Sequence, residues 1–526
     1  MRTFLAPQRH KISWPPPSPP LPLSPSILLL AAAGVLWGLV LARFSFPNIL
    51  MLIALSVAAV GSVIEPLVGI GVALFLGPFW AWLPIAVPQV PPLIGQYVFL
   101  LAVAAWAARG LMRRSFRLPA PALLLPLLLF MGVTLLSLWN PIDEWVGWWE
   151  WAKWGQILLM ALLVYDRLTE NDGTARSGWL VVMLALPAVF QAAVGIWQSV
   201  WWGGAPENFA INDRFFRAYG TFQQPNPYAG FLGMIGALLV GPLLVIGWEW
   251  IVKKLRVRSC ELGVRNCELQ SSAPHSSLLT PHSSLLTPKW LLMPAVALIG
   301  VGIVASWSRG AWMGFGIALL AMAAALPKRG AWGIVLALAL VGGGLGLYSA
   351  GLLPVSIANR LTGFMEYTRF EDVRGAGIND ANFAVLERMA HWQAALDMWR
   401  ANFWFGVGFG GYDAAYLEYR LINWKLALGH AHNYYLNLLA ETGVTGLAAY
   451  LTFLGSVFWG LWGATRRLSG WQRGLAVGLI GAWMHMAAHD LVDNILVNNV
   501  HLHLGVILAL SAWVMRVASE ELRMRS

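Results

Sequence analysis

The chain has 526 residues, of which 58% are hydrophobic and only 11% are charged. Soluble globular proteins carry about 25% charged residues, so this composition excludes an ordinary water-soluble fold and indicates a membrane protein. The formal net charge of +10 does not indicate nucleic-acid binding, because the basic residues gather in short segments between apolar runs. The positive-inside rule places such segments in the cytoplasm. They contain Arg113, Arg114, Arg117, Lys253, Lys254, Arg256, Arg258, Lys328, Arg329, Arg466, Arg467, Arg523 and Arg525.

The chain begins with a proline-rich stretch that precedes the first apolar run, 27–42. No small-residue cleavage site follows this run, so we expect a retained span and a cytoplasmic tail over 1–26. Spans of roughly 20 apolar residues divide the chain into about fourteen predicted crossings. They lie at 27–42, 48–63, 66–87, 93–109, 119–138, 147–165, 178–200, 228–250, 290–306, 311–327, 331–349, 443–463, 473–489 and 498–516.

This pattern predicts an all-α polytopic protein, since the apolar runs are continuous rather than alternating. Starting inside, the count places every basic segment on the cytoplasmic side. We therefore expect a membrane domain over 27–349, an extracytoplasmic loop over 350–442, C-terminal membrane helices over 443–517 and a cytoplasmic tail over 518–526.

Within the membrane domain, the cytoplasmic segment 253–289 contains tandem repeats, "VRSCEL"/"VRNCEL" and "PHSSLLT" twice. Cys260 and Cys267, and likewise His275 and His282, are seven residues apart because the repeat is seven residues long. Zinc ligands usually come in tighter pairs. We interpret this segment as a disordered insertion without a metal site.

The loop 350–442 contains "NFAVLERMAHWQAALDMWRANFW", whose apolar residues recur at helical spacing and predict an amphipathic helix. The glycines of "FGVGFGGY" end it. This stretch is not a dinucleotide fingerprint, because it follows a helix rather than a strand and opens no helix.

Candidate site residues lie on the predicted outer side. Arg217 lies in "DRFFRAYGTFQQPNPYAGF", Arg309 in the short connection "SWSRGAW", and "HDLVDN" spans His489 to Asn494. Together with His432 they gather two arginines, a histidine and carboxylates. The planar guanidinium group binds phosphate oxygens through two parallel hydrogen bonds, which favours an anion site.

Structural roles remain open for each of these side chains. Arg309 could snorkel to helix-end carbonyl groups, Arg217 could pair with Glu207 or Asp213, and histidine is also a packing residue at helix ends. Histidine is nevertheless the side chain most easily tuned to exchange protons near neutral pH.

Helical geometry gives one expectation for His432. If a continuous helix begins near Asn433, Gly443 and Gly446 share the face of His432 and allow another helix or a lipid chain to approach. Glu441 then points the opposite way, so Asn433 or an outer carboxylate is expected to orient His432.

"HN" followed by nine residues and "GVTG" resembles the His-[Asn/Ser/Gln]-x9-Gly-x-x-Gly motif of the bacterial O-antigen ligases and the related O-antigen polymerases. Arg217 in "RAYGTF" and Arg309 in "SRGAW" match the two outer arginines of that family. "ERMAHWQAALDMW", with Arg388, is similar to the stretch ahead of the family's histidine. The resemblance extends from about residue 200 to 500. It implies about twelve spans, so together with the apolar runs we expect about 12–14 transmembrane helices and one large extracytoplasmic loop.

The resemblance implies a membrane glycosyltransferase at the outer face of the bacterial cytoplasmic membrane, with no metal and no cofactor. Its partners are a lipid-linked glycan donor on undecaprenyl pyrophosphate and a glycan or glycolipid acceptor. Arg217 and Arg309 would neutralise the leaving group, and His432 would take the hydroxyl proton or position the hydroxyl. Arg388 and Asn433 are further substrate-binding candidates, and His489 and Asp493 are weaker ones.

Two alternatives stay open. A polysaccharide polymerase of the same family would use the same leaving-group site with another lipid-linked chain as acceptor. A transporter belongs to a different class, and it is disfavoured because transported ions usually need ionisable groups within the spans.

The repeat insertion is expected to be dispensable. Deleting Cys260 to Thr287 removes both cysteines and the repeats from the face opposite the predicted chemistry. Activity of the membrane-inserted protein should change little. Loss of activity at normal expression would mean that the insertion binds a metal or a partner.

Overall fold

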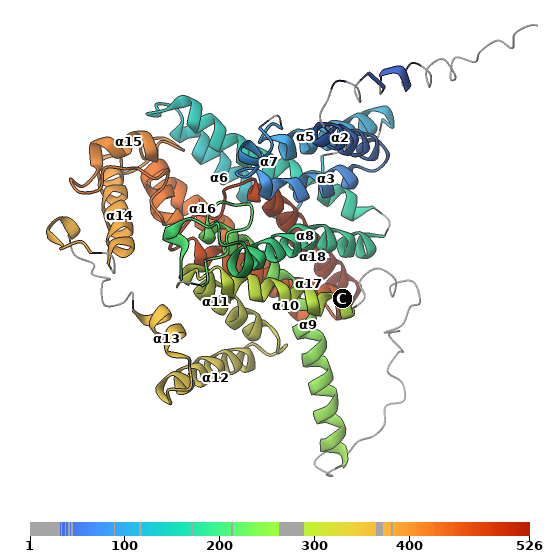
Figure 1. Ribbon diagram of the computed structural model, residues 1–526. Helices are drawn as coiled ribbons and strands as arrows, with labels where there is room; N and C mark the ends of the chain where they lie inside the picture. The colour runs from blue at the N-terminus through green and yellow to red at the C-terminus, as the bar shows by residue number, and fades with distance from the viewer. Residues whose placement is uncertain are drawn as a thin grey trace, which may run out of the picture. The chain divides into compact units, whose positions relative to one another are not determined.

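The computed structural model describes residues 46–88, 90–114, 118–170, 172–211, 214–261, 289–363, 372–379 and 382–525, together with a few residues between 32 and 43. The chain divides at residue 56 into two units. Apart from the first part of α2, residues 46–56, the features below lie within the second unit, residues 57–526. Figure 1 shows its helices, and among the described residues the only β-pairing is one isolated bridge between Ala210 and Phe216.

The long helices follow the apolar runs in chain order. They are α2 (Phe46–Ile64), α3 (Pro66–Leu76), α5 (Ile94–Met112), α6 (Leu124–Ser137), α7 (Glu144–Thr169), α8 (Gly173–Trp197), α9 (Pro225–Glu261), α10 (Lys289–Ala305), α11 (Arg309–Ala325), α12 (Gly330–Ser349), α16 (Tyr434–Arg467), α17 (Gly470–His489) and α18 (Val500–Arg525). Within the described residues, six helices are long and apolar enough to cross a membrane. The predicted all-α polytopic membrane fold is confirmed.

Two predicted segments differ in detail from the structure. The predicted span 66–87 is not one helix, since α3 ends at Leu76 and is followed by a short 3₁₀ turn (Gly77–Phe79) and α4 (Leu83–Ala86). Pro78 and Pro84 each lie near the start of one of these short pieces, where proline is tolerated, whereas it breaks the interior of a helix. The predicted insertion begins inside α9, and 262–288 lie outside the described residues, as does most of the first span, 27–42.

Helix α9 packs against α17 and α11 at the centre of the bundle. A Cβ atom at Gly241 would lie 2.2 Å from the backbone nitrogen of Gly478, and one at Gly474 would lie 2.7 Å from the Cα atom of Pro242. The Gly474–Gly478 spacing is the small-xxx-small pattern that lets helix backbones approach closely in membranes. This close contact fixes α17 against α9.

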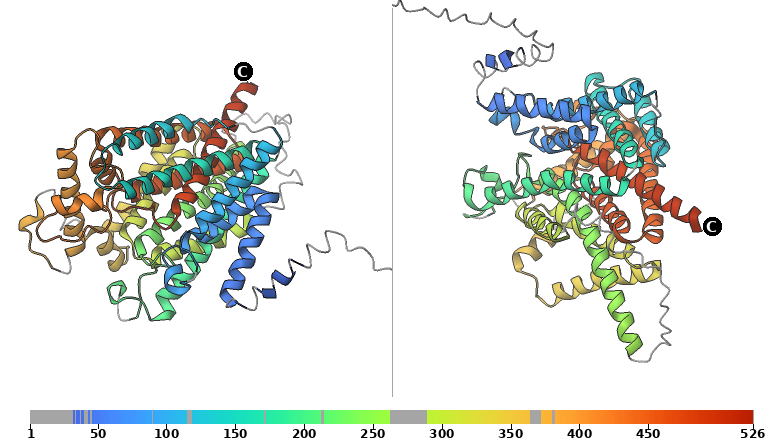
Figure 2. Two further views of the ribbon diagram at one scale, coloured as in Figure 1. Left: turned by 90° about the horizontal axis from the view of Figure 1, so that it is seen from above. Right: turned by 90° about the vertical axis from the view of Figure 1, so that its right-hand side faces the viewer.

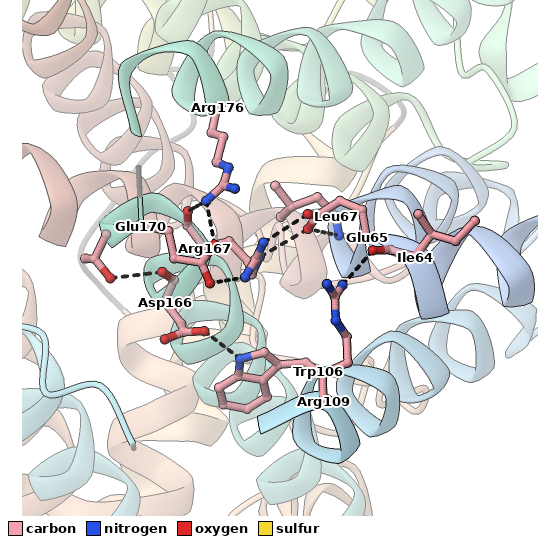
Figure 3. Close-up of polar contacts among 10 residues, drawn as sticks. Ile64, Glu65, Leu67, Trp106, Arg109, Asp166, Arg167, Glu170 and Arg176 are labelled. Carbon is pink, nitrogen blue, oxygen red and sulfur yellow. Dashed lines mark hydrogen bonds and ion pairs between the residues drawn. The ribbon is translucent and has the colours of Figure 1, made fainter. Parts of the chain in front are cut away.

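An ionic cluster joins the ends of α5, α7 and α8 to the start of α3 (Figure 3). The Arg167 guanidinium donates to both carboxylate oxygens of Glu65, at 3.1 and 3.0 Å, and pairs with Glu170. Arg176 donates to Glu170 at 3.1 Å, and Arg109 donates to the Ile64 carbonyl at 2.6 Å. The predicted topology places all these residues on the cytoplasmic side, so their grouping agrees with it.

The predicted loop 350–442 contains α13 (Val355–Thr362), α14 (Phe383–Ala401) and α15 (Tyr412–Tyr419), and the last two lie beside the beginning of α16 (Figures 1 and 2). The amphipathic helix is thus present as α14. Helix α16 begins at Tyr434, earlier than the predicted span 443–463, so the loop ends before residue 442.

Helix α16 is not continuous, which corrects the expectation of one helical face shared by His432 and the two glycines. Gly443 has φ 64° and ψ −167°, outside the helical region. A Cβ atom there would lie 2.3 Å from the carbonyl of Trp404. Gly443 therefore admits the backbone of the loop after α14, rather than a second membrane helix or a lipid chain.

Thiol labelling tests on which side of the membrane α14 and the connection between α11 and α12 lie. In a protein with Cys260→Ser and Cys267→Ser, we expect Arg400→Cys to react with an impermeant maleimide in intact cells. Lys328→Cys should react only after lysis. Both side chains are exposed, so labelling of Lys328→Cys alone in intact cells would reverse the topology.

Candidate functional site

A cavity of about 420 Å³ opens where five separate parts of the chain meet. It is lined by Asn208, Arg217, Asn226, Ser308, Arg309, Gly310, Met313, Arg360, Ala384, Val385, Arg388, Met389, Trp392, His489, Val492 and Asp493. Five of the seven predicted site residues are among them. His432 and Asn433 do not line the cavity, although His432 lies directly behind Asp493.

Four arginines converge on this cavity, one more than the three predicted. Arg217 donates through Nε to the Ser306 carbonyl at 3.0 Å and through Nη2 to Asn226 at 2.9 Å. Of the two carboxylates expected to pair with Arg217, Glu207 is not among these partners, and Asp213 lies outside the described residues. Burial and the charges of Arg388 and Arg309 lower the pKa of Arg217 to about 10.

The other cations also lie close to one another. Arg388 lies on α14, donates to the Ala384 carbonyl at 3.2 Å, and keeps a buried Nε without a hydrogen-bond partner. The missed arginine is Arg360 on α13. Burial, followed by the charges of Arg309, Arg217 and Arg388, lowers the pKa of Arg360 to about 10. Like charges within reach of one another favour a ligand that carries several negative charges.

His489 reaches the cavity because two glycines leave room for its ring. A Cβ atom at Gly230 on α9 would lie 2.7 Å from the His489 ring, and one at Gly310 on α11 would lie 3.0 Å from it. Both ring nitrogens of His489 are buried without a hydrogen-bond partner. Because Gly310 of "SRGAW" has no side chain, the end of α17 can pack close to the start of α11. This packing places Asp493 near Arg309.

Asp493 is paired with two histidines. Its Oδ1 atom lies 3.9 Å from Nε2 of His430 and 3.9 Å from Nδ1 of His432. Burial alone would raise the pKa of Asp493, but His432, His430, His489 and Arg388 hold it well below its usual range. The carboxylate therefore stays ionised.

The backbone fixes the tautomer of His430. The backbone N–H of His432 donates to Nδ1 of His430 at 3.0 Å, so the proton of neutral His430 is on Nε2, facing Asp493. Burial and His432 lower the pKa of His430 to about 4, which keeps it neutral. Nδ1 of His432 also faces the carboxylate, but 3.9 Å is beyond hydrogen-bond reach, and both ring nitrogens of His432 are buried without a hydrogen-bond partner. A histidine beside a carboxylate is the usual arrangement of a base and its orienting group.

The position of His432 is set from both sides. Its φ of 51° is unfavourable for a residue with a side chain, and such residues concentrate at functional sites. Tyr434 N donates to the Asp490 carbonyl at 2.8 Å, which ties the start of α16 to the segment carrying Asp493. On the other side, the ring of His391 lies 5.5 Å from that of His432, edge to face.

Asn433 has a positioning role in this arrangement. Its side-chain oxygen accepts from Leu436 N at 3.0 Å and caps α16, and its Nδ2 donates to the Leu491 carbonyl at 2.9 Å. Both ends of the amide are thus used within the protein. Glu441 does not orient His432. Its carboxylate accepts a hydrogen bond from Tyr412 N instead.

His430, His432 and Asp493 also form a group whose nitrogen and oxygen atoms lie within 4.8 Å of one another, close enough to hold a metal ion. The tautomer argues against that use. A metal ligand must offer a lone pair, and Nε2 of His430 carries its proton while Nδ1 accepts from the backbone. The tautomer of His430 therefore fits metal ligation poorly.

Residues 294–451 match the model of a protein family. The description of that family is O-antigen ligase. This match confirms the resemblance to the O-antigen ligases and polymerases. The matched stretch runs from α10 into α16 and contains Arg309, Arg360, Arg388 and His432, whereas Arg217 and Asp493 lie outside it. A comparison with curated proteins found no match.

The pairing of His432 with Asp493 can be tested by a double-mutant cycle. His432→Ala is expected to lower turnover by roughly 10²–10⁴-fold, the usual worth of a general base, and Asp493→Asn should cause a smaller loss by releasing the ring. Because the two act as a unit, the double variant should be little worse than His432→Ala alone.

His430→Ala should be milder than either single change. Asp397→Asn, which alters an exposed carboxylate paired with Arg400, is the matched control and should be neutral. Additive losses for His432→Ala and Asp493→Asn would show that the two side chains act independently.

Proposed function

We propose that the protein is a metal-independent glycosyltransferase that moves a glycan from undecaprenyl pyrophosphate to a sugar hydroxyl at the outer face of the bacterial cytoplasmic membrane. The family match supports an enzyme of the O-antigen ligase type. The observation that carries the proposal is the cavity itself, where four guanidinium groups face one carboxylate next to a paired histidine.

Pyrophosphate is the anion that this cavity suits. Its two phosphate groups offer several oxygens to Arg217, Arg309 and Arg388, and planar guanidinium groups bind such oxygens two at a time. During transfer the bond between the sugar C1 atom and the phosphate oxygen breaks, and negative charge grows on the leaving pyrophosphate. Preorganised cations stabilise that charge without a metal ion.

His432 supplies the proton acceptor. The acceptor hydroxyl oxygen forms the new bond to C1, and its proton passes to Nε2 of His432 as the bond to phosphate breaks. Asp493, whose Oδ1 atom lies 3.9 Å from Nδ1, stabilises the imidazolium that results. His489 lines the cavity near the arginines and is proposed to contact the donor.

Exchange of arginine for lysine tests the leaving-group site. Arg309→Lys and Arg217→Lys keep the charge but lose the planar pair of donors, so each should lower transfer by roughly tenfold or more. A snorkelling role predicts near-normal activity, because lysine also reaches the interface. Arg400→Lys, on the exposed end of α14, is the control. Wild-type rates for both cavity variants would remove the pyrophosphate site from the proposal.

The lipid-linked glycan that accumulates after gene deletion separates the remaining possibilities. Long chains would indicate a ligase, and single repeat units would indicate a polymerase of the same family. A transporter would transfer no glycan when the purified protein is mixed with donor and acceptor in detergent.

A further inference from the structure

The turn between α10 and α11 has an unusual backbone. Trp307 has φ 54°, in the left-handed region that is costly for a residue with a side chain. Immediately after it, Ser308 N donates to the Ser306 hydroxyl at 3.1 Å, and the Ser308 side chain caps the first turn of α11. Arg309 and Gly310 follow in that first turn. The conformation of Trp307 therefore determines where Arg309 enters the cavity.

Two arginines from distant segments hold consecutive carbonyl groups of this turn. Arg217 donates to the Ser306 carbonyl at 3.0 Å. Arg360 donates twice to the next carbonyl, that of Trp307, through Nη2 at 2.7 Å and Nε at 3.2 Å. The Arg360 guanidinium also lies over the Trp307 ring, 5.9 Å from its centroid. The two hydrogen bonds from Arg360 and its contact with the Trp307 ring both favour the positive φ of Trp307.

Arg360 stays in the cavity wall despite the neighbouring positive charges. Repulsion by Arg309, Arg217 and Arg388 adds to the cost of burial. Two charge-assisted hydrogen bonds to one carbonyl oppose that cost. A lysine at this position has one nitrogen at the end of a flexible chain and does not reproduce the planar pair of donors.

We propose that Arg360 is a positioning residue for the glycosyl transfer. It holds Trp307 in the left-handed conformation and so directs Arg309 and the first turn of α11 at the pyrophosphate of the donor. This inference rests on the proposed function. Arg360 lies 53 residues beyond Trp307, on the short helix α13. In this proposal α13 therefore takes a direct part in assembling the leaving-group site.

The test asks whether removing the backbone strain at Trp307 compensates for the loss of Arg360. Arg360→Ala and Arg360→Lys should both lower kcat/KM for the lipid-linked donor by roughly tenfold or more, since neither preserves both hydrogen bonds. Each is then combined with Trp307→Gly or Trp307→Ala. Both replacements remove the ring that packs on Trp312 at 5.1 Å, but only glycine adopts positive φ without strain. Trp307→Gly should restore much of the activity of Arg360→Ala, and Trp307→Ala should not.

A binding measurement tests the positioning role of Arg360 without relying on glycosyl transfer. The affinity of each purified variant for inorganic pyrophosphate, measured by calorimetry, should show the same loss and the same rescue by glycine. Equal behaviour of Trp307→Gly and Trp307→Ala, or normal activity and affinity in Arg360→Lys, would overturn the positioning role. If wild-type protein binds pyrophosphate with this pattern yet transfers no glycan, the proposed function fails and the positioning role stands.

Discussion

Repulsion among like charges is the constraint that organises this site. Arg217, Arg309, Arg360 and Arg388 line one cavity, and Asp493 is the one carboxylate among the described lining residues. Guanidinium groups remain charged under all ordinary conditions, so the excess positive charge cannot be relieved by losing protons. Backbone carbonyl groups take up part of it, through Ser306 and Trp307. The remainder is available to a multiply charged anion.

Small residues bring the acid–base group to that charge. Gly241 meets Gly478 where α9 crosses α17, and Gly230 and Gly310 leave room for the His489 ring. The same packing carries the segment after α17 to the cavity, where Asp493 meets His432. An alanine at any of these glycines would put a Cβ atom against backbone or a ring. The glycines thus serve the site through packing rather than through contact with substrate.

The sequence predicted the helical segments well, because runs of apolar residues determine membrane helices almost by themselves. It also predicted Arg217, Arg309, Arg388, His489 and Asp493, since charged side chains are conspicuous among apolar neighbours. It did not single out Arg360, which lines the cavity, or place His430 beside Asp493, because both contacts join residues far apart in the sequence. It was wrong about one continuous helical face after His432, because helical periodicity cannot reveal that the loop at Trp404 displaces Gly443 from helical geometry. The positive φ of Gly443 is a property of that tertiary contact.

Asp493 links the two halves of the proposed chemistry, since it lines the cavity and also faces His432. Its charge interacts with Arg388 as well as with the histidines. A bound pyrophosphate would draw the arginines toward its own oxygens and leave the carboxylate to the histidine pair. The imidazolium formed by proton transfer would then lie beside a carboxylate that it no longer shares with Arg388, and a buried ion pair of this kind is stronger than one in water. In the proposed reaction, donor binding would thereby prepare His432 to take a proton, so that the hydroxyl is activated chiefly when a leaving group is present.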